Sequence, residues 1–155
     1  MRITAKTDYA VRAMAELAGM GDDCLTADHI AARQDIPVRF LFGIFRELRL
    51  AGLVVSVRGP EGGYRLARSA REITLADVIR AVDGSLANVR DLELSTMSYP
   101  GPAASLPDVW RALRTSLRRV LEATTLADLA SGSLPESVGL MAREYLDNPR
   151  GARGR

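Results

Sequence analysis

LRLAGLVVSVRGPEGGY, residues 48–64, decides the fold of this 155-residue chain. Residues 53–57 alternate in character and are rich in β-branched side chains, which favours a strand. Residues 59–63 combine a proline with glycines, which favours a tight turn, and Tyr64 opens a second β-rich run that continues to residue 67. The stretch therefore predicts a two-stranded hairpin.

Three short helices are predicted before this hairpin. Apolar residues recur at helical spacing over residues 4–20, Thr26 is a suitable N-cap for a second helix, and a third runs from Pro37 to about residue 50. Three helices followed by a hairpin is the order of a winged helix-turn-helix domain. The predicted fold class is mostly α with a small β wing, and the winged domain spans residues 1–70.

The rest of the chain is predicted to form a connecting helix and loop (71–103), a dimerisation helix with C-terminal helices (104–146) and a disordered tail (147–155). The phrase Thr-Leu-Ala-Asp occurs at 74–77 and again at 125–128. A threonine followed three residues later by a carboxylate is typical of a helix N-terminus. We interpret the repeat as one capping solution used twice, not as a duplicated domain.

The long helix carries an apolar stripe whose members are four, three, four and three residues apart. They are Leu106, Trp110, Leu113, Leu117 and Val120. This spacing is typical of a coiled-coil seam. The stripe could pack on the chain's own core, but the three short helices already supply one another with a core. We therefore expect the stripe to pair with its twin in a homodimer.

The third helix has two unlike faces. The apolar face, expected in the core, consists of Leu41, Ile44, Phe45 and Leu48. The opposite face consists of Arg39, Phe42, Gly43, Arg46 and Arg49. Arginines on an exposed helix face suit the major groove of double-stranded DNA, where they pair with guanine edges or phosphates. Phe42 would contact a thymine methyl group and Gly43 would permit close approach; the alternative is a solvated basic face with Phe42 folded onto a neighbouring helix.

The hairpin tip adds a second candidate contact with DNA. Arg58 is followed by Gly59, Gly62 and Gly63, and such a tip can enter a minor groove with its arginine. The alternative is an ordinary turn with a surface arginine. Glu61 at the tip opposes phosphate binding and should lower the salt dependence slightly.

Composition limits the class of partner. The chain has 21 basic and 19 acidic residues, a net charge of +2, and Lys6 is its only lysine. DNA affinity should therefore depend on a few placed arginines and not on a broad positive field. The sequence contains no apolar run long enough for a membrane span and no signal-type start, so we expect a cytoplasmic protein without a membrane partner.

An enzyme is not supported by the sequence. Cys24 is the only cysteine and His29 the only histidine, which excludes an internal disulfide and a four-cysteine metal site. No metal or other cofactor is expected. A partly apolar setting favours Cys24 as a small buried side chain, and a redox-active thiol is the alternative.

The sequence resembles a known family. The similarity covers residues 1–131, including the starting Met-Arg-Ile-Thr, the hairpin stretch, the segment 73–84, Trp110 and the segment 125–129. These residues resemble the Rrf2 family of bacterial transcription regulators, of the IscR, NsrR and CymR type. The resemblance implies a homodimer that binds a palindromic operator, with the long helix as the dimer element. A repressor is the leading hypothesis.

The departures from the family concern its sensor. Cluster-binding members carry three cysteines in the loop before the long helix, whereas residues 88–107 contain none here. Asp8 stands where some relatives place a carboxylate ligand, but it has no thiolates to complement. We therefore expect no iron–sulfur cluster.

The signal that regulates the protein is then a small ligand between the DNA-binding unit and the long helix, a protein effector, or oxidation of Cys24. The rival functions are a protein-interaction module with weak DNA binding and a Cys24-based redox regulator.

Overall fold

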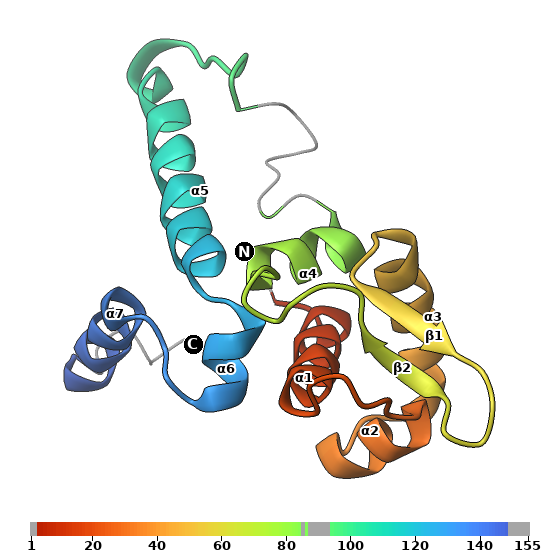
Figure 1. The fold of residues 1–155 in the computed structure, drawn as a ribbon. Coiled ribbons are helices and arrows are strands. Elements are labelled where there is room, and N and C mark those ends of the chain that lie inside the picture. Colours follow the sequence, from red (N-terminus) through yellow and green to blue (C-terminus); the bar gives the residue numbers. More distant parts are fainter. Residues whose placement is uncertain (1–2, 85, 87–93, 149–155) are drawn as a thin grey trace.

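The chain folds into a helical body with a small wing, from which one long helix projects (Figure 1). The computed structural model describes residues 3–84, 86 and 94–148. Its elements, in chain order, are α1 (Ala5–Gly19), α2 (Ala27–Gln34), α3 (Val38–Leu50), β1 (Val54–Val57), β2 (Gly63–Leu66), α4 (Leu75–Asp83), the 3-10 turn η1 (Gly101–Ala103), α5 (Leu106–Ala123), α6 (Leu126–Ser131) and α7 (Glu136–Asp147). The predicted class, mostly α with a β wing, is confirmed.

Threonines begin four of the helices. Thr4, Thr26, Thr74 and Thr125 each accept a hydrogen bond from the backbone N–H three residues ahead, which satisfies a donor that the helix leaves unpaired. At the last of these, hydrogen bonds from the backbone N–H and then the hydroxyl of Thr125 lower the pKa of Asp128. Both Thr-Leu-Ala-Asp segments form capping boxes, as expected.

The wing is wider at its base than a simple hairpin. β1 and β2 pair antiparallel, with Val54 opposite Leu66 and Val57 opposite Gly63. On the other edge of β2, Tyr64 exchanges backbone hydrogen bonds of 2.9 and 2.7 Å with Leu25, in the segment before α2. This pairing anchors the hairpin to the helical body.

The hydrophobic core extends beyond the first 70 residues. The buried face of α3 contributes Leu41, Ile44, Phe45 and Leu48, as predicted. Ile73 and Leu126, from the segments before α4 and at the start of α6, are also fully buried in the same cluster. The core of the winged unit is thus completed by Ile73, which precedes α4, and by Leu126, which follows the long helix α5.

The two capping segments lie side by side. Thr74 and Thr125 form an antiparallel bridge, in which the backbone N–H of Leu75 donates to Thr124 and that of Leu126 donates to Ile73, each at 2.9 Å. Their similarity in sequence thus accompanies a direct pairing in space.

The helices α5 and α7 stand apart from this core. Pro107 is the only buried residue of α5, and α7 has no buried residue. α7 continues to Asp147, the first residue of the expected tail, and Asn148 caps it; residues 149–155 lie outside the described residues. None of the helices among the described residues combines the length and apolar character needed to cross a bilayer.

Candidate nucleic-acid interface

The outer face of α3 is open to solvent. Its exposed members are those predicted from the spacing: Arg39, Phe42, Gly43, Arg46 and Arg49. The opposite, buried face fixes this orientation, because four apolar side chains enter the core there. Leu50, which is 80% exposed, extends the face at its C-terminal end and was not among the predicted residues.

The arginines of this face have no carboxylate partner. Within the part of the chain that the structure describes, no ion pair involves Arg39, Arg46 or Arg49. Of these three arginines, Arg39 alone contacts another described side chain through its guanidinium, which lies 5.2 Å from the centre of the Phe40 ring. By contrast, the arginines that carry ion pairs lie on other elements: Arg12, Arg33, Arg80, Arg111 and Arg118. The outer face of α3 therefore presents positive charge without internal neutralisation.

Phe42 and Gly43 are not explained by packing within the chain. Phe42 is 54% exposed, and it is the neighbouring Phe40 whose ring contacts Tyr9, with centroids 6.0 Å apart. A Cβ added at Gly43 would meet nothing within 4 Å. Phe42 is thus more exposed than expected for a ring folded onto a neighbouring helix, and it lies with Gly43 on the same exposed face as the arginines.

A hollow of about 660 Å³ separates the C-terminal half of α3 from the wing. Arg46, Arg49 and Leu50 line it from the helix, and Val54, Val55 and Ser56 line it from β1. Two guanidinium groups without ion pairs, at the edge of an open concave surface, suit the phosphate backbone of DNA. The contribution of Ser56 could not be anticipated, since it depends on where the strand lies against the helix.

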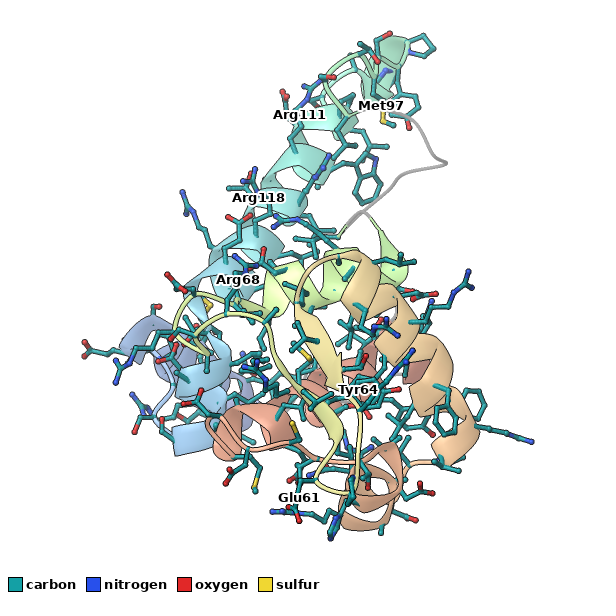
Figure 2. All side chains as sticks on the ribbon, turned by 45° about the vertical axis from the view of Figure 1, so that its right-hand side comes forward. Glu61, Tyr64, Arg68, Met97, Arg111 and Arg118 are labelled. Atoms are coloured by element: carbon teal, nitrogen blue, oxygen red, sulfur yellow. The ribbon has the colours of Figure 1, made fainter. Side chains whose placement is uncertain are left out.

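The wing glycines have structural reasons of their own. Gly59 has a φ of +107°, and Gly63 has a φ of +145°, both rarely adopted by other residues. A Cβ at Gly62 would lie 2.3 Å from the carbonyl oxygen of Val57, and one at Gly63 would lie 2.5 Å from that of Leu25. These glycines shape the hairpin and its junction with the body. At the tip of the hairpin, the charged side chains of Arg58 and Glu61 are exposed; Glu61 is labelled in Figure 2.

An aromatic stack joins the wing to α3. The rings of Phe45 and Tyr64 lie 4.0 Å apart between centroids and 9° from parallel. Phe45 is fully buried, so the stack ties β2 to the inner side of the helix whose outer side carries the arginines. Tyr64 lies in the stretch that predicted the hairpin, but its role in positioning the wing was missed because a helix–strand contact leaves no periodic signal.

Lys6 joins three helices. Its ammonium group donates to the carboxylate of Glu47 on α3 at 2.9 Å and to the carbonyl oxygen of Val82 on α4 at 2.7 Å. Beside it, the Thr7 hydroxyl donates to Asp83 at 2.6 Å. The only lysine of the chain therefore fixes α3 relative to α1 and the end of α4.

The predicted dimer stripe is incompletely covered in a single chain. Leu106, Trp110, Leu117 and Val120 are half-buried, and Leu113 is 46% exposed. Val109, 56% exposed, lies beside them. The arm that carries this stripe rises from the body and bears Arg111 and Met97 near its far end (Figure 2). One chain leaves the stripe available for further burial.

The residues considered for metal or redox chemistry do not converge. Asp8 forms an ion pair with Arg12 at 3.0 Å, His29 is exposed on α2, and Cys24 is a free thiol that is half-buried and not fully buried as expected. Across residues 3–84, 86 and 94–148, no group of three or more histidine, cysteine or acidic side chains could hold a metal ion.

Comparison of the sequence with known proteins gives consistent matches. The family described as Rrf2, iron-dependent transcriptional regulator, matches residues 3–132. A protein of Mycobacterium tuberculosis named as an HTH-type transcriptional regulator is 53% identical over 146 residues, covering 94% of this chain and 91% of that protein. The HTH-type transcriptional regulator IscR of Pectobacterium atrosepticum is 35% identical, covering 100% of this chain and 93% of the relative.

Solved structures show the same architecture. CymR, the global cysteine regulator of B. subtilis, is similar with a TM-score of 0.71 and 33% identity, covering 84% of this chain and 97% of that one. IscR of T. potens is similar with a TM-score of 0.67 and 34% identity, covering 86% and 88%.

Proposed function

The chain belongs to the Rrf2 family of transcriptional regulators, and on this premise we propose that it is a homodimeric repressor that binds an inverted-repeat operator without an iron–sulfur cluster. The observation that carries the proposal is the outer face of α3, where Arg39, Arg46 and Arg49 are exposed and carry no ion pair among the described residues. Unpaired guanidinium groups on a rigid helix are suited to guanine edges and phosphates.

In this proposal α3 enters the major groove and the wing follows the adjacent backbone. Phe42 and Gly43 form the apolar contact with base edges, because an exposed phenyl ring beside a residue without a side chain can approach a thymine methyl group. Arg58 at the tip reaches the neighbouring minor groove. Glu61, next to it, limits the number of phosphates that the wing neutralises.

Pairing of two copies along α5 supports an inverted-repeat operator. The stripe from Leu106 onward is only partly buried in one chain, and its spacing is that of a two-helix seam. A two-fold dimer presents two α3 helices to half-sites about one helical turn, roughly 34 Å, apart. Operator and protein would then share one symmetry axis.

The donor set argues against a cluster, although the family description names iron. Clusters are held mainly by cysteine thiolates, and Cys24 is the only one in the whole sequence. The expected carboxylate, Asp8, is already paired with Arg12. The residues of this chain do not fit the group, and regulation is therefore assigned to another signal. As a proposed chromosomal DNA-binding protein, it is expected in the cytoplasm.

The test is selection of genomic fragments with the purified full-length protein, followed by sequencing of the bound pool. The proposal expects a reproducible inverted repeat whose half-site spacing matches one helical turn. Anaerobically purified protein is analysed in parallel for iron and acid-labile sulfide, and stoichiometric amounts of both would overturn the cluster-free assignment. Recovery of no common sequence, with binding that depends only on salt, would favour the rival protein-interaction module.

A further inference from the structure

A small pocket lies between α4 and α5, where the long helix meets the DNA-binding unit. It has a volume of about 270 Å³. Its lining residues are Arg80, Gly84, Leu86, Arg114 and Arg118. Among the described lining residues, every ionisable side chain is thus an arginine, although the two helices that form the pocket also carry acidic residues.

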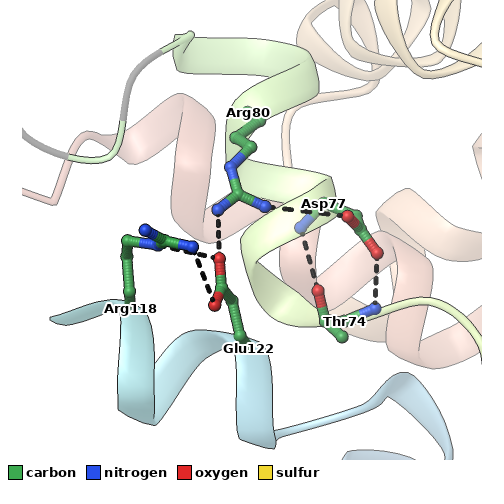
Figure 3. Close-up of polar contacts among 5 residues, drawn as sticks. All are labelled: Thr74, Asp77, Arg80, Arg118 and Glu122. Atoms are coloured by element: carbon green, nitrogen blue, oxygen red, sulfur yellow. Dashed lines mark hydrogen bonds and ion pairs between the residues drawn. The ribbon is translucent and has the colours of Figure 1, made fainter. Parts of the chain in front are cut away.

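The arginines of the pocket are only partly neutralised. Arg80 and Arg118 share the carboxylate of Glu122, which Arg118 contacts at 3.0 Å, and Arg80 lies 3.9 Å from Asp77 (Figure 3). Hydrogen bonds from Arg80 and then Arg118 lower the pKa of Glu122, so this carboxylate is charged at neutral pH. Arg114 makes no ion pair within the described ranges. Among the described residues, three guanidinium groups therefore face two carboxylates, those of Asp77 and Glu122, which leaves an excess of positive charge.

Asp77 adds a second negative charge beside Arg80, but it is held within α4 and does not reach the arginines of α5. Its carboxylate accepts a hydrogen bond of 3.0 Å from the backbone N–H of Thr74, and its own N–H donates to the Thr74 hydroxyl at 3.2 Å. This capping box holds Asp77 at the start of α4 (Figure 3). Within the described part of the chain, Glu122 is therefore the carboxylate that pairs with arginines of both helices at the pocket.

We propose that this pocket binds a small oxyanion, a phosphate or carboxylate group of a metabolite, which the guanidinium groups of Arg80, Arg114 and Arg118 hold. Guanidinium groups bind such groups through paired, charge-assisted hydrogen bonds. Glu122 occupies part of the same arginine fork and is the internal competitor of the ligand. At about 270 Å³ the pocket is slightly smaller than the sites of drug-sized ligands, about 300–1,000 Å³, which fits a small oxyanion.

The position of the pocket connects it to α3. The turn that ends α4 beside Gly84 is tied to α1, because Lys6 donates to Val82 and Thr7 donates to Asp83. Lys6 also holds Glu47 on α3. An anion that draws α4 and α5 together would change the setting of the two α3 helices in a dimer, and this effect on DNA affinity rests on the proposed function. Binding of the anion itself does not.

The anion site is tested by isothermal titration calorimetry of the full chain with sodium pyrophosphate and, separately, with citrate, against sodium chloride of equal ionic strength. We expect saturable binding of at least one probe, and the better probe identifies the phosphate or carboxylate class. Arg114→Ala should weaken it by at least about tenfold, the loss expected for one charged hydrogen bond. Glu122→Gln should tighten it several-fold.

The matched control is Arg119→Ala, which removes the same charge from the same helix outside the pocket. It should bind the probe as the parent does. Equal losses in the two arginine variants, or no saturable binding by the parent, would overturn the site. Because Arg114 makes no ion pair with any described residue, its variant should also unfold at the parental temperature, and a large decrease would overturn the interpretation of its weakened binding.

Coupling is tested by fluorescence anisotropy with the selected operator, with and without the probe. The probe should change operator affinity of the parent and of Arg119→Ala, but not of Arg114→Ala. An unchanged affinity in the parent would overturn the regulatory role while leaving the anion site intact. Failure to bind any DNA sequence would instead contradict the proposed function, and the calorimetry would still decide on the pocket.

Discussion

The helices α3 and α5 are both amphipathic and both rich in arginine, yet the structure uses their two faces in opposite ways. α3 buries its apolar face completely and leaves Arg39, Arg46 and Arg49 without ion pairs among the described residues. α5 buries only Pro107, while Arg111 and Arg118 are paired with acidic side chains of their own helix.

The difference shows what each helix lacks. On α3 the unmet requirement is electrostatic, because positive charge remains without a partner, and a polyanion such as DNA supplies it. On α5 the unmet requirement is hydrophobic, because apolar area remains in contact with water, and a second copy of the stripe supplies it. The two helices therefore present surfaces for different classes of partner.

Truncation of a buried side chain of α3 should produce the largest effect, a loss of folding stability. Phe45 is fully buried and stacks on Tyr64, so Phe45→Ala should reduce the free energy of unfolding by about 3–5 kcal/mol and loosen the wing as well. Urea denaturation followed by circular dichroism measures it. The matched control, Phe42→Ala on the exposed face, should change stability little. Similar losses from both variants would contradict the assignment of faces.

A charge in the stripe of α5 should produce the next largest effect, on association. Leu117→Glu brings two like charges together in the proposed dimer and removes apolar burial. We expect a loss of about 2 kcal/mol or more, roughly thirtyfold in the dimer dissociation constant. Sedimentation velocity over a concentration series measures it. Ser116→Glu, one residue away on an exposed position, is the control; if Leu117→Glu associates as well as this control, α5 is not the seam.

A change on the outer face of α3 should alter DNA binding without altering the fold. Arg39→Ala removes an exposed guanidinium that makes no ion pair within the described part of the chain, and it should cost about 1–3 kcal/mol of operator binding and relax base preference at one position. Anisotropy with operator variants measures both. Arg143→Ala on α7 is the control for net charge. If Arg39→Ala keeps the affinity and the base selectivity of the parent, the assignment of α3 to the major groove is contradicted.

The smallest effect is expected from loss of the Glu122 carboxylate, which pairs with Arg80 on α4 and Arg118 on α5. The pKa of Glu122 is lowered from 4.5 by its hydrogen bonds with Arg80 and then Arg118, so its contribution to stability is present above that value and is lost as the pH falls through the lower, folded-state pKa. Glu122→Gln should therefore unfold at a slightly lower temperature than the parent at pH 7. The difference should shrink in acid, and thermal scans between pH 7 and pH 3 measure it. A difference that grows in acid would reverse the assigned sign.

Much of this architecture could be predicted because it depends on residues that are close together in the sequence. The Thr26 cap, the two capping boxes, the hairpin around Gly59 and the buried face of α3 each depend on residues within one or two turns of one another. For the same reason the exposed arginines of α3 followed from spacing alone, since a residue opposite a buried face must be exposed.

The contacts that position the candidate site could not be predicted, because they join segments far apart in the chain. Lys6 reaches Glu47 and Val82 across many intervening residues, and Tyr64 pairs with Leu25 along an edge that the hairpin pattern does not reveal. Gly63 is an instructive case: the sequence suggested a contact with DNA, whereas the close approach of the Leu25 backbone already requires a residue without a Cβ. A single sequence carries no record of such distant neighbours.

The burial of Leu126 beneath the DNA-binding unit has a genetic consequence. Synthesis proceeds from the N-terminus, so the unit's core stays open until α5 has been made and α6 has followed it. A chain that ends before α6 lacks this side chain and the pairing of Leu126 with Ile73, so the core around α1 is left incomplete. Such a fragment would not compete with the full-length protein for operators, so early nonsense alleles of this regulator should be recessive.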